Sequence, residues 1–377
     1  MKIVYCIHGT FNSGGMERVL ANKVNYWAEN KKYQTYIITT EQKGRVPFFY
    51  FHPSVKHYDL NINYGEDTNC SLVVKVFRFL RKKRLHRKRL IALLHEIKAD
   101  VVVSMFGNEA SFLPAIKDGS KKVLEIHFSK FFRLQNNRSG LWKLVDWFRS
   151  RQDENTVQRF DRFVVLTHED KTFWHTQHNI TVIPNANLLK PMQPAELINC
   201  NAIAVGRLSY QKGFDRLIEA WKIVHKTQPD WHLSIFGDGE LKKELLAQIT
   251  ALKLEDSIKI LPPTLNIGEE YYKNSLLVLS SHYEGLPMVL LEGMAYGLPV
   301  VAFACKCGPK DIITNGKEGF LIEEGNVSTL AEGIIKLICD EKLRKRMGEA
   351  AYLKSQSYSE EIIMKKWQEL FNSLLSN

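Results

Sequence analysis

The chain has 377 residues, of which 45% are hydrophobic, so it is too long for one ordinary core and suits two domains. No apolar run approaches the length of a bilayer span, and the opening residues lack a signal-peptide pattern, so we expect neither a transmembrane helix nor a leader. The net charge of +11 arises in the first half, where residues 1–190 carry 31 Lys and Arg against 17 Asp and Glu. This asymmetry indicates an anionic partner for that half, which leaves membrane, nucleic acid or a charged substrate open.

Short apolar runs alternate with helical patterns along the first half. Such alternation predicts a parallel, doubly wound α/β sheet. The first expected strand, Lys2–Ile7, reads as buried, and further expected strands are Tyr36–Thr40, Val55–Leu60, Asp100–Met105, Val123–His127 and Phe163–Thr167. Of the six cysteines only Cys305 and Cys307 are close, and no second pair or His cluster completes a zinc site. We therefore expect reduced thiols in a cytoplasm.

The loop after the first expected strand contains Gly14 and Gly15, and a helical pattern follows from Val19 to Asn30. A strand, a loop with paired glycines and a helix are the general plan of a turn that holds phosphate. The loop is neither a dinucleotide fingerprint nor a Walker loop. A flexible turn without a ligand is the alternative.

The segment Lys75–Arg89 holds nine Lys or Arg and no acidic residue. Its apolar residues keep approximate helical spacing, which is typical of a basic amphipathic helix at a membrane surface. We assign membrane binding to Arg81, Lys82, Lys83 and Arg84. A solvated basic face is the alternative, and nucleic acid is a third option, although no aromatic or Arg platform accompanies the run.

His127 ends the expected strand Val123–His127. Open α/β sheets bind ligands at the carboxyl ends of their strands, which favours a functional role over a structural one. The aromatic-rich stretch Phe131–Arg159 fits an acceptor or lipid-facing surface, or simply a packed helix. Val182–Asn187 precedes a polar, Pro-containing stretch and is the best candidate for an interdomain hinge.

In the second half, the expected strand Ala202–Arg207 runs into a loop that ends at Lys212 and Gly213. A guanidinium and an ammonium five residues apart, just past a strand, can hold one diphosphate from two directions. Gly206 and Gly213 allow close backbone approach there. A further expected strand, His232–Phe236, ends at Gly237, which belongs to a turn able to approach a nucleotide. The next expected strands are Ile258–Leu261 and Val300–Ala304.

The stretch from Leu276 to Gly297 reads as a strand, a loop and a helix that starts near Pro287. Glu284 and Glu292 bracket the helix start. The unpaired N–H groups expected there, on Met288, Val289 and Leu290, favour an anion. An ordinary solvated helix start is the alternative.

Together these segments resemble the retaining nucleotide-sugar glycosyltransferases of family 4. The similarity rests on Glu284 and Glu292 in an E-x7-E spacing, on G-R-L-x-x-x-K-G at Gly206–Gly213, on the Gly14–Gly15 loop and on His127. The resemblance implies the GT-B fold, with two Rossmann-like, doubly wound parallel-sheet domains facing one another across a cleft. It places the acceptor-binding domain at residues 1–186, the nucleotide-sugar domain at 187–356, and a last helix at about 357–377 that packs back on the first domain. Phe128 departs from the family, which usually has Asp or Asn there.

The resemblance also implies the chemistry: retaining, metal-independent transfer of a hexosyl or N-acetylhexosaminyl group from a nucleotide sugar, with UDP favoured and no cofactor. The catalytic candidates are His127, Arg207, Lys212 and Glu284. The donor-binding candidates are Gly15, Gly206, Gly237, Met288, Val289, Leu290 and Glu292, with Glu292 assigned to ribose hydroxyls.

A glycan or lipid-linked saccharide is the expected acceptor, used for cell-surface polysaccharide such as capsule, O-antigen or exopolysaccharide. We expect a cytoplasmic enzyme that associates peripherally with the inner leaflet of the plasma membrane. A GT-B-fold UDP-sugar epimerase is the alternative enzyme. A basic nucleic-acid-binding protein is the alternative without enzymatic activity.

Overall fold

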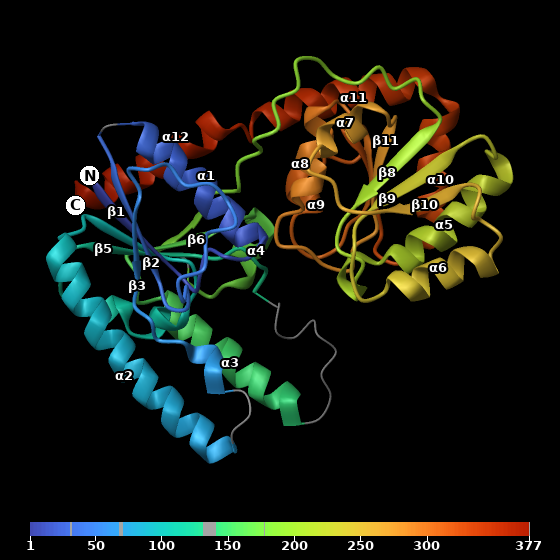
Figure 1. The fold of residues 1–377 in the computed structure, drawn as a ribbon. Coiled ribbons are helices and arrows are strands. Elements are labelled where there is room, and N and C mark those ends of the chain that lie inside the picture. Colours follow the sequence, from blue (N-terminus) through green and yellow to red (C-terminus); the bar gives the residue numbers. More distant parts are fainter. Residues whose placement is uncertain (31, 68–70, 131–140, 177, 377) are drawn as a thin grey trace. The chain divides into compact units, whose positions relative to one another are not determined.

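The computed structural model describes residues 1–30, 32–67, 71–130, 141–176 and 178–376. The chain forms two compact units (Figure 1). The first comprises Met1–Leu166, Lys171–Ile183 and Met364–Asn377, and the second comprises Thr167–Asp170 and Pro184–Ile363. The main chain thus passes between the units at Ile183 and Pro184, within the stretch predicted as a hinge.

The first unit contains a seven-stranded parallel sheet with the order β3-β2-β1-β4-β5-β6-β7. Its strands are β1 Lys2–Ile7, β2 Gln34–Thr39, β3 Lys56–Asp59, β4 Val101–Ser104, β5 Lys121–Glu125, β6 Arg162–Val165 and β7 Ile180–Val182. Sequence reasoning missed β7, because three residues next to Pro184 give no recognisable pattern. It also extended β5 to His127, which lies two residues beyond the strand.

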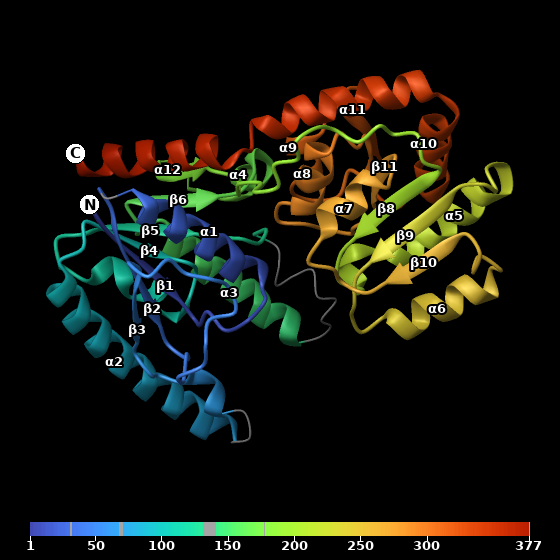
Figure 2. The same cartoon turned by 45° about the horizontal axis from the view of Figure 1, so that its top comes forward.

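The helices that the structure describes wholly or partly in the first unit are α1 Gly15–Glu29, α2 Leu72–Ile97, α3 Leu141–Val157, α4 His168–Phe173 and α12 Glu360–Leu375. Short 3-10 turns stand at Tyr64–Asp67, Asn108–Ser111 and Leu113–Ala115. Helix α1 begins at Gly15 and not at Val19, so the glycine pair is its N-cap and first turn. Helix α12 lies beside α1, where the rings of Phe371 and Trp27 are 6.0 Å apart (Figure 2).

The second unit contains a six-stranded parallel sheet with the order β10-β9-β8-β11-β12-β13. Its strands are β8 Asn201–Val205, β9 His232–Phe236, β10 Ile258–Leu261, β11 Leu276–Leu279, β12 Val300–Phe303 and β13 Gly319–Ile322. Its helices are α5 Phe214–Thr227, α6 Lys242–Ala251, α7 Ile267–Tyr272, α8 Met288–Ala295, α9 Pro309–Ile312, α10 Val327–Cys339 and α11 Glu341–Gln356, and a 3-10 turn spans Tyr210–Lys212.

Both faces of this second sheet are covered, which explains why its strands are continuous apolar runs. Leu276 and Val278 join the core that α5 and α10 cover. Leu277 points to the opposite face, where α8 packs so closely that a Cβ on Gly293 would lie 2.8 Å from Leu277 Cδ2. The prediction of two doubly wound parallel sheets is therefore confirmed.

In each sheet the strand order reverses next to the first strand: between β1 and β4 in the first unit, and between β8 and β11 in the second. Open α/β sheets bind ligands outside the carboxyl ends of the strands at such a reversal. In the second unit this position brings together the loop after β8 and the loop after β11. These two loops carry most of the predicted site residues. Among the described residues, no helix is both long and apolar enough to cross a membrane.

Candidate functional site

Lys212 and Glu284, predicted from separate segments, are in direct contact in the second unit. Lys212 Nζ donates a hydrogen bond to Glu284 Oε1 at 2.7 Å, and Ser281 Oγ donates to the same oxygen at 2.6 Å. The two charged side chains are 16% and 6% exposed. A partly desolvated ion pair of this kind holds both groups in fixed positions beside the end of β11.

Glycines on either side of Lys212 allow this placement. The backbone of Gly213 has φ +58°, and a Cβ there would lie 2.4 Å from Ser280 O. A Cβ on Gly206 would lie 3.0 Å from Lys212 Cε, so the stem of Lys212 packs on bare backbone. Ser280 Oγ also donates to Lys212 O at 2.9 Å. The glycines therefore bring the loop after β8 against the end of β11, which carries the ammonium to the carboxylate.

Arg207 lies two residues beyond the end of β8 and is exposed. Next to it, the loops after β8 and β9 touch through glycine. A Cβ on Gly237 would lie 1.9 Å from Gly206 O, and a Cβ on Gly239 would lie 2.4 Å from Leu208 O. Gly206 and Gly237 thus have a structural role in packing these loops, whether or not a ligand also approaches them.

The N-terminus of α8 differs in detail from the prediction. Pro287 is the N-cap residue, so the helix begins one residue later than the assumed start. The Leu290 N–H donates to Pro287 O at 2.9 Å, which leaves Met288 and Val289 as the amide donors for an anion. Glu292 lies on the second turn and is 9% exposed, and its Oε2 accepts a hydrogen bond from Tyr271 Oη at 3.1 Å.

In the first unit, His127 lies just past β5 in a charged cluster that includes residues missed at the sequence level. Its Nε2 is 3.1 Å from Glu125 Oε1, and the side chain is 7% exposed. Its Nδ1 has no hydrogen-bond partner among the described residues. Buried polar groups normally have partners, so this nitrogen is a candidate for contact with a bound ligand.

Glu125 forms the centre of this charged cluster. It is buried and paired with Lys23, whose ammonium also lies 3.9 Å from the centroid of the Trp367 ring. Burial alone would raise the pKa of Glu125, but Lys23 and His127 lower it to about 2. A glutamate at the end of an apolar strand was the available sequence signal, since a buried carboxylate requires a cation.

Gly15 is the first residue of α1, and a Cβ there would meet no atom within 4 Å. Gly14 differs, because a Cβ on it would lie 2.3 Å from Glu17 Oε2. The first glycine is therefore fixed by packing, whereas the second faces open space at a helix N-terminus.

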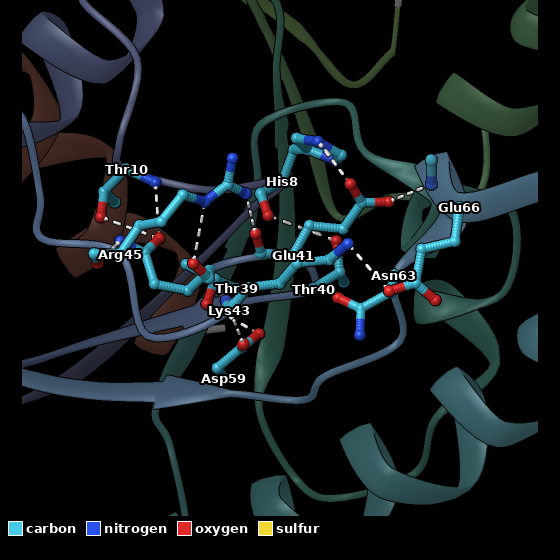
Figure 3. Close-up of polar contacts among 12 residues, drawn as sticks. His8, Thr10, Thr39, Thr40, Glu41, Lys43, Arg45, Asp59, Asn63 and Glu66 are labelled. Atoms are coloured by element: carbon cyan, nitrogen blue, oxygen red, sulfur yellow. Dashed lines mark hydrogen bonds and ion pairs between the residues drawn. The ribbon is translucent and has the colours of Figure 1, made fainter. Parts of the chain in front are cut away.

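A second polar cluster stands where β1, β2 and β3 end (Figure 3). His8 Nε2 is 3.3 Å from Glu41 Oε2, and Glu41 Oε1 accepts a hydrogen bond from the Gly65 N–H at 2.5 Å. Lys43 Nζ pairs with Glu66 Oε1 at 2.8 Å, and the Lys43 N–H donates to Asp59 Oδ2 at 3.0 Å. These contacts fix the loops after the three strands, and sequence reasoning assigned none of these residues.

The basic segment forms part of α2, and its apolar residues lie exposed among the cations. Val76, Phe77 and Leu80 are 53%, 69% and 49% exposed. Lys82 differs from its neighbours, since its Nζ donates to Asn63 O at 2.5 Å and lies 3.9 Å from Glu66 Oε2. Arg81 and Arg84 are exposed, so they suit a surface role better than Lys82 does.

Metal ligands were not predicted from the sequence. In the part of the chain that the structure describes, no group of three or more His, Cys, Asp or Glu could hold a metal ion. Cys305 and Cys307 are buried free thiols, and burial raises the pKa of both.

Comparison with known proteins decides the family. Residues 13–186 match the sequence model of Glycosyltransferase Family 4, and residues 201–354 match that of Glycosyl transferases group 1. An uncharacterized glycosyltransferase of Haemophilus influenzae is 33% identical over 373 residues, which cover 97% of this chain and 99% of the relative. The chain belongs to the group 1, family 4 glycosyltransferases.

Two further similarities agree with that assignment. The amylovoran biosynthesis glycosyltransferase AmsD of Erwinia amylovora is 29% identical over 385 residues, covering 98% of this chain and 99% of the relative. The crystal structure of HepE from Anabaena in complex with UDP superposes with a TM-score of 0.76 at 20% identity, covering 99% of this glycosyltransferase and 100% of that chain. The fold is therefore GT-B, as predicted.

Proposed function

We propose that this glycosyltransferase moves a hexosyl or N-acetylhexosaminyl group from a UDP sugar to a glycan or lipid-linked saccharide, with retention of the anomeric configuration. The observation that carries the proposal is the placement of Lys212 and Glu284 in contact at the strand-order reversal of the second unit, with Arg207 in the same loop as Lys212. The UDP in HepE and the amylovoran pathway of AmsD support the donor and the biosynthetic setting.

The ion pair suggests how the donor would bind. Lys212 holds Glu284 at 2.7 Å in this structure, and a donor diphosphate would offer the ammonium a second anionic partner. Glu284 could then accept a hydrogen bond from a hydroxyl of the donor sugar. Arg207 and Lys212 would neutralise the charge that develops on the leaving diphosphate, and this electrostatic contribution is usually the largest in such catalysis. The Met288 and Val289 amides would add two donors.

The remaining assignments follow from position. Glu292, oriented by Tyr271, would accept hydrogen bonds from ribose hydroxyls. His127 and Gly15 keep their proposed roles as contacts of the donor sugar and of its diphosphate. No carboxylate is assigned as a nucleophile, so we infer front-side attack by the acceptor hydroxyl, with the leaving phosphate taking its proton. Two built-in cations would make a metal ion unnecessary, and we propose that no cofactor is required.

We also propose that the enzyme works in the cytoplasm on the inner leaflet, and that α2 is its membrane contact. Exposed Phe77 and Leu80 lie among cations that include Arg81 and Arg84, and this combination suits an anionic lipid surface. The acceptor would belong to cell-surface polysaccharide synthesis.

A thermal-shift screen in EDTA tests the proposal. A ligand that binds only the folded protein stabilises it by RT ln(1 + [L]/Kd), so UDP and one UDP sugar should raise the melting temperature more than GDP, ADP and their sugars. NMR of the product formed from that UDP sugar should then show a retained anomeric configuration. A requirement for Mg²⁺ or Mn²⁺, an inverted product, or epimerisation without transfer would contradict it.

A further inference from the structure

The first unit has a hollow of about 460 Å³ whose lining residues, apart from Lys83, have no assigned role. It lies between α2, α3 and the loop that follows β4. The lining residues are Phe79, Lys83, Phe106, Gly107, Asn108, Ala110, Ser111, Arg149, Gln152, Asp153 and Thr156. Its volume falls within the range of about 300–1,000 Å³ that is usual for small-molecule sites.

The hollow stands at a favourable place in the sheet. It adjoins the loop after β4, and β4 is the strand next to β1 at which the strand order of the first sheet reverses. Ligands of open α/β sheets bind at the carboxyl ends of strands at such a reversal. The hollow is therefore placed as a ligand site of the first unit would be.

The loop that forms its wall is strained and firmly held. Phe106 has φ +61°, a left-handed conformation that is unfavourable for a bulky residue. Buried Glu109 accepts hydrogen bonds from Ser104 Oγ at 2.6 Å and from the Gly107 N–H at 3.2 Å, and so holds the loop. Strain of this kind is more common at functional sites than elsewhere.

The same wall reaches the strand end that carries His127. The rings of Phe106 and Phe128 meet edge to face, with centroids 5.3 Å apart and planes at 82°. Phe128 follows His127 directly and is the residue that departs from the usual family pattern. The contact gives Phe128 a role, since it joins the wall of the hollow to the candidate catalytic histidine.

The lining chemistry suits a saccharide attached to an anion. Phe79 and Phe106 offer apolar ring surface for a sugar face, and Asn108, Gln152 and Thr156 can exchange hydrogen bonds with hydroxyls. Lys83 and Arg149 supply two cations against the single acid of the lining, Asp153. A neutral glycan alone would not require the excess of cations, whereas a saccharide with a phosphate group would.

The hollow also borders the proposed membrane helix. Phe79 and Lys83 stand on α2 within the turns that expose Phe77 and Leu80. A saccharide in the hollow could therefore remain attached to a lipid whose chain lies in the membrane. We infer that this hollow is the acceptor site and that it binds the sugar nearest the phosphate of a polyprenyl-diphosphate-linked saccharide. The inference rests on the proposed glycosyl transfer and names its acceptor class.

Single substitutions of exposed lining residues test the inference with little risk to folding. We would compare Asn108→Ala, Arg149→Ala and Gln152→Ala with the matched control Arg151→Ala, an exposed arginine on α3 outside the lining. The acceptor probe is a chloroform–methanol extract of lipid-linked saccharides from membranes of the cells that make this protein. The readouts are the apparent acceptor KM of the transfer reaction and, separately, the affinity for UDP.

The lining variants should raise the acceptor KM at least tenfold and leave the affinity for UDP unchanged, whereas Arg151→Ala should match the unsubstituted enzyme. Unchanged acceptor KM in all three lining variants would overturn the inference, as would an equal loss of UDP affinity. Failure of the unsubstituted enzyme to bind UDP would instead contradict the proposed function. The two failures are therefore distinguishable.

Discussion

Replacing Gly15 by alanine should separate the proposed donor-binding role of the first loop from its role in folding. A Cβ on Gly15 meets no atom within 4 Å, and the residue is the first of α1, so the native backbone accepts alanine. Alanine at a compatible helical position stabilises by at most about 1 kcal/mol relative to glycine. The free energy of unfolding should therefore stay equal or rise slightly.

If Gly15 lacks a side chain so that the donor diphosphate can approach the backbone, the added methyl group should lower kcat/KM for the donor. A tenfold loss in kcat/KM for the UDP sugar corresponds to about 1.4 kcal/mol, a modest cost for displacing one phosphate contact. Urea unfolding and steady-state kinetics on the same preparation give both quantities. Normal donor kinetics in a stable Gly15→Ala enzyme would refute the assignment. Gly14→Ala is the contrasting variant, since its Cβ would lie 2.3 Å from Glu17 Oε2 and require Glu17 to move.

Three further predictions follow from the same structure. Arg207→Ala and Lys212→Ala should each lower turnover roughly a hundredfold without unfolding the protein, and near-normal turnover in either would contradict their role at the diphosphate. Burial lowers the pKa of His86 from its ordinary 6.5 to about 4, so the unfolded state binds more protons between these values. The contribution of neutral His86 to the free energy of unfolding should be fully present above pH 6.5 and should fall by up to about 3 kcal/mol as the pH drops to 4. In urea titrations, His86→Gln should reduce this dependence of the unfolding free energy on pH. Replacing Arg81, Lys82, Lys83 and Arg84 with Gln should release the enzyme from phosphatidylglycerol liposomes but leave UDP affinity intact. If a control variant with the same loss of charge is released equally, liposome binding depends on net charge and not on α2. That control replaces four exposed lysines of the second unit, namely Lys222, Lys226, Lys243 and Lys259.

The sheets were predictable because the inner strands of each sheet are buried on both faces. Runs such as Leu276–Leu279 and Val300–Phe303 are apolar throughout, which distinguishes buried parallel strands from half-exposed ones. The strands that were missed, β7 and β13, are short and lie at the ends of their sheets. In β13, Gly319 has φ +156° and lies beside Val300 O of β12. This conformation depends on the neighbouring strand, so the local sequence does not predict it.

The candidate site was predictable to the extent that its residues stand at strand ends. Arg207, Lys212 and Glu284 follow β8 and β11, and the fold itself brings these strands together. The charged surroundings of Glu125, which contacts His127, were not predictable. Lys23 lies on α1, and Trp367, whose ring contacts the Lys23 ammonium, lies on α12, far away along the chain. No local pattern predicts that a helix buries a lysine to neutralise a carboxylate on a strand.

The contact between Lys212 and Glu284 shows how the fold brings together residues that were predicted from separate segments. Each residue was assigned separately, the lysine to a diphosphate and the glutamate to a sugar, and the structure pairs them at 2.7 Å. A buried charge without a partner is costly, so the two groups stabilise one another in this position. A donor diphosphate would give Lys212 a second anionic partner, and Glu284 would then be able to bind the sugar. In this scheme Glu284→Gln should weaken transfer of the sugar more than the binding of UDP alone, since UDP needs only the cations. A larger loss of UDP affinity than of transfer would show that the carboxylate serves the lysine and not the sugar.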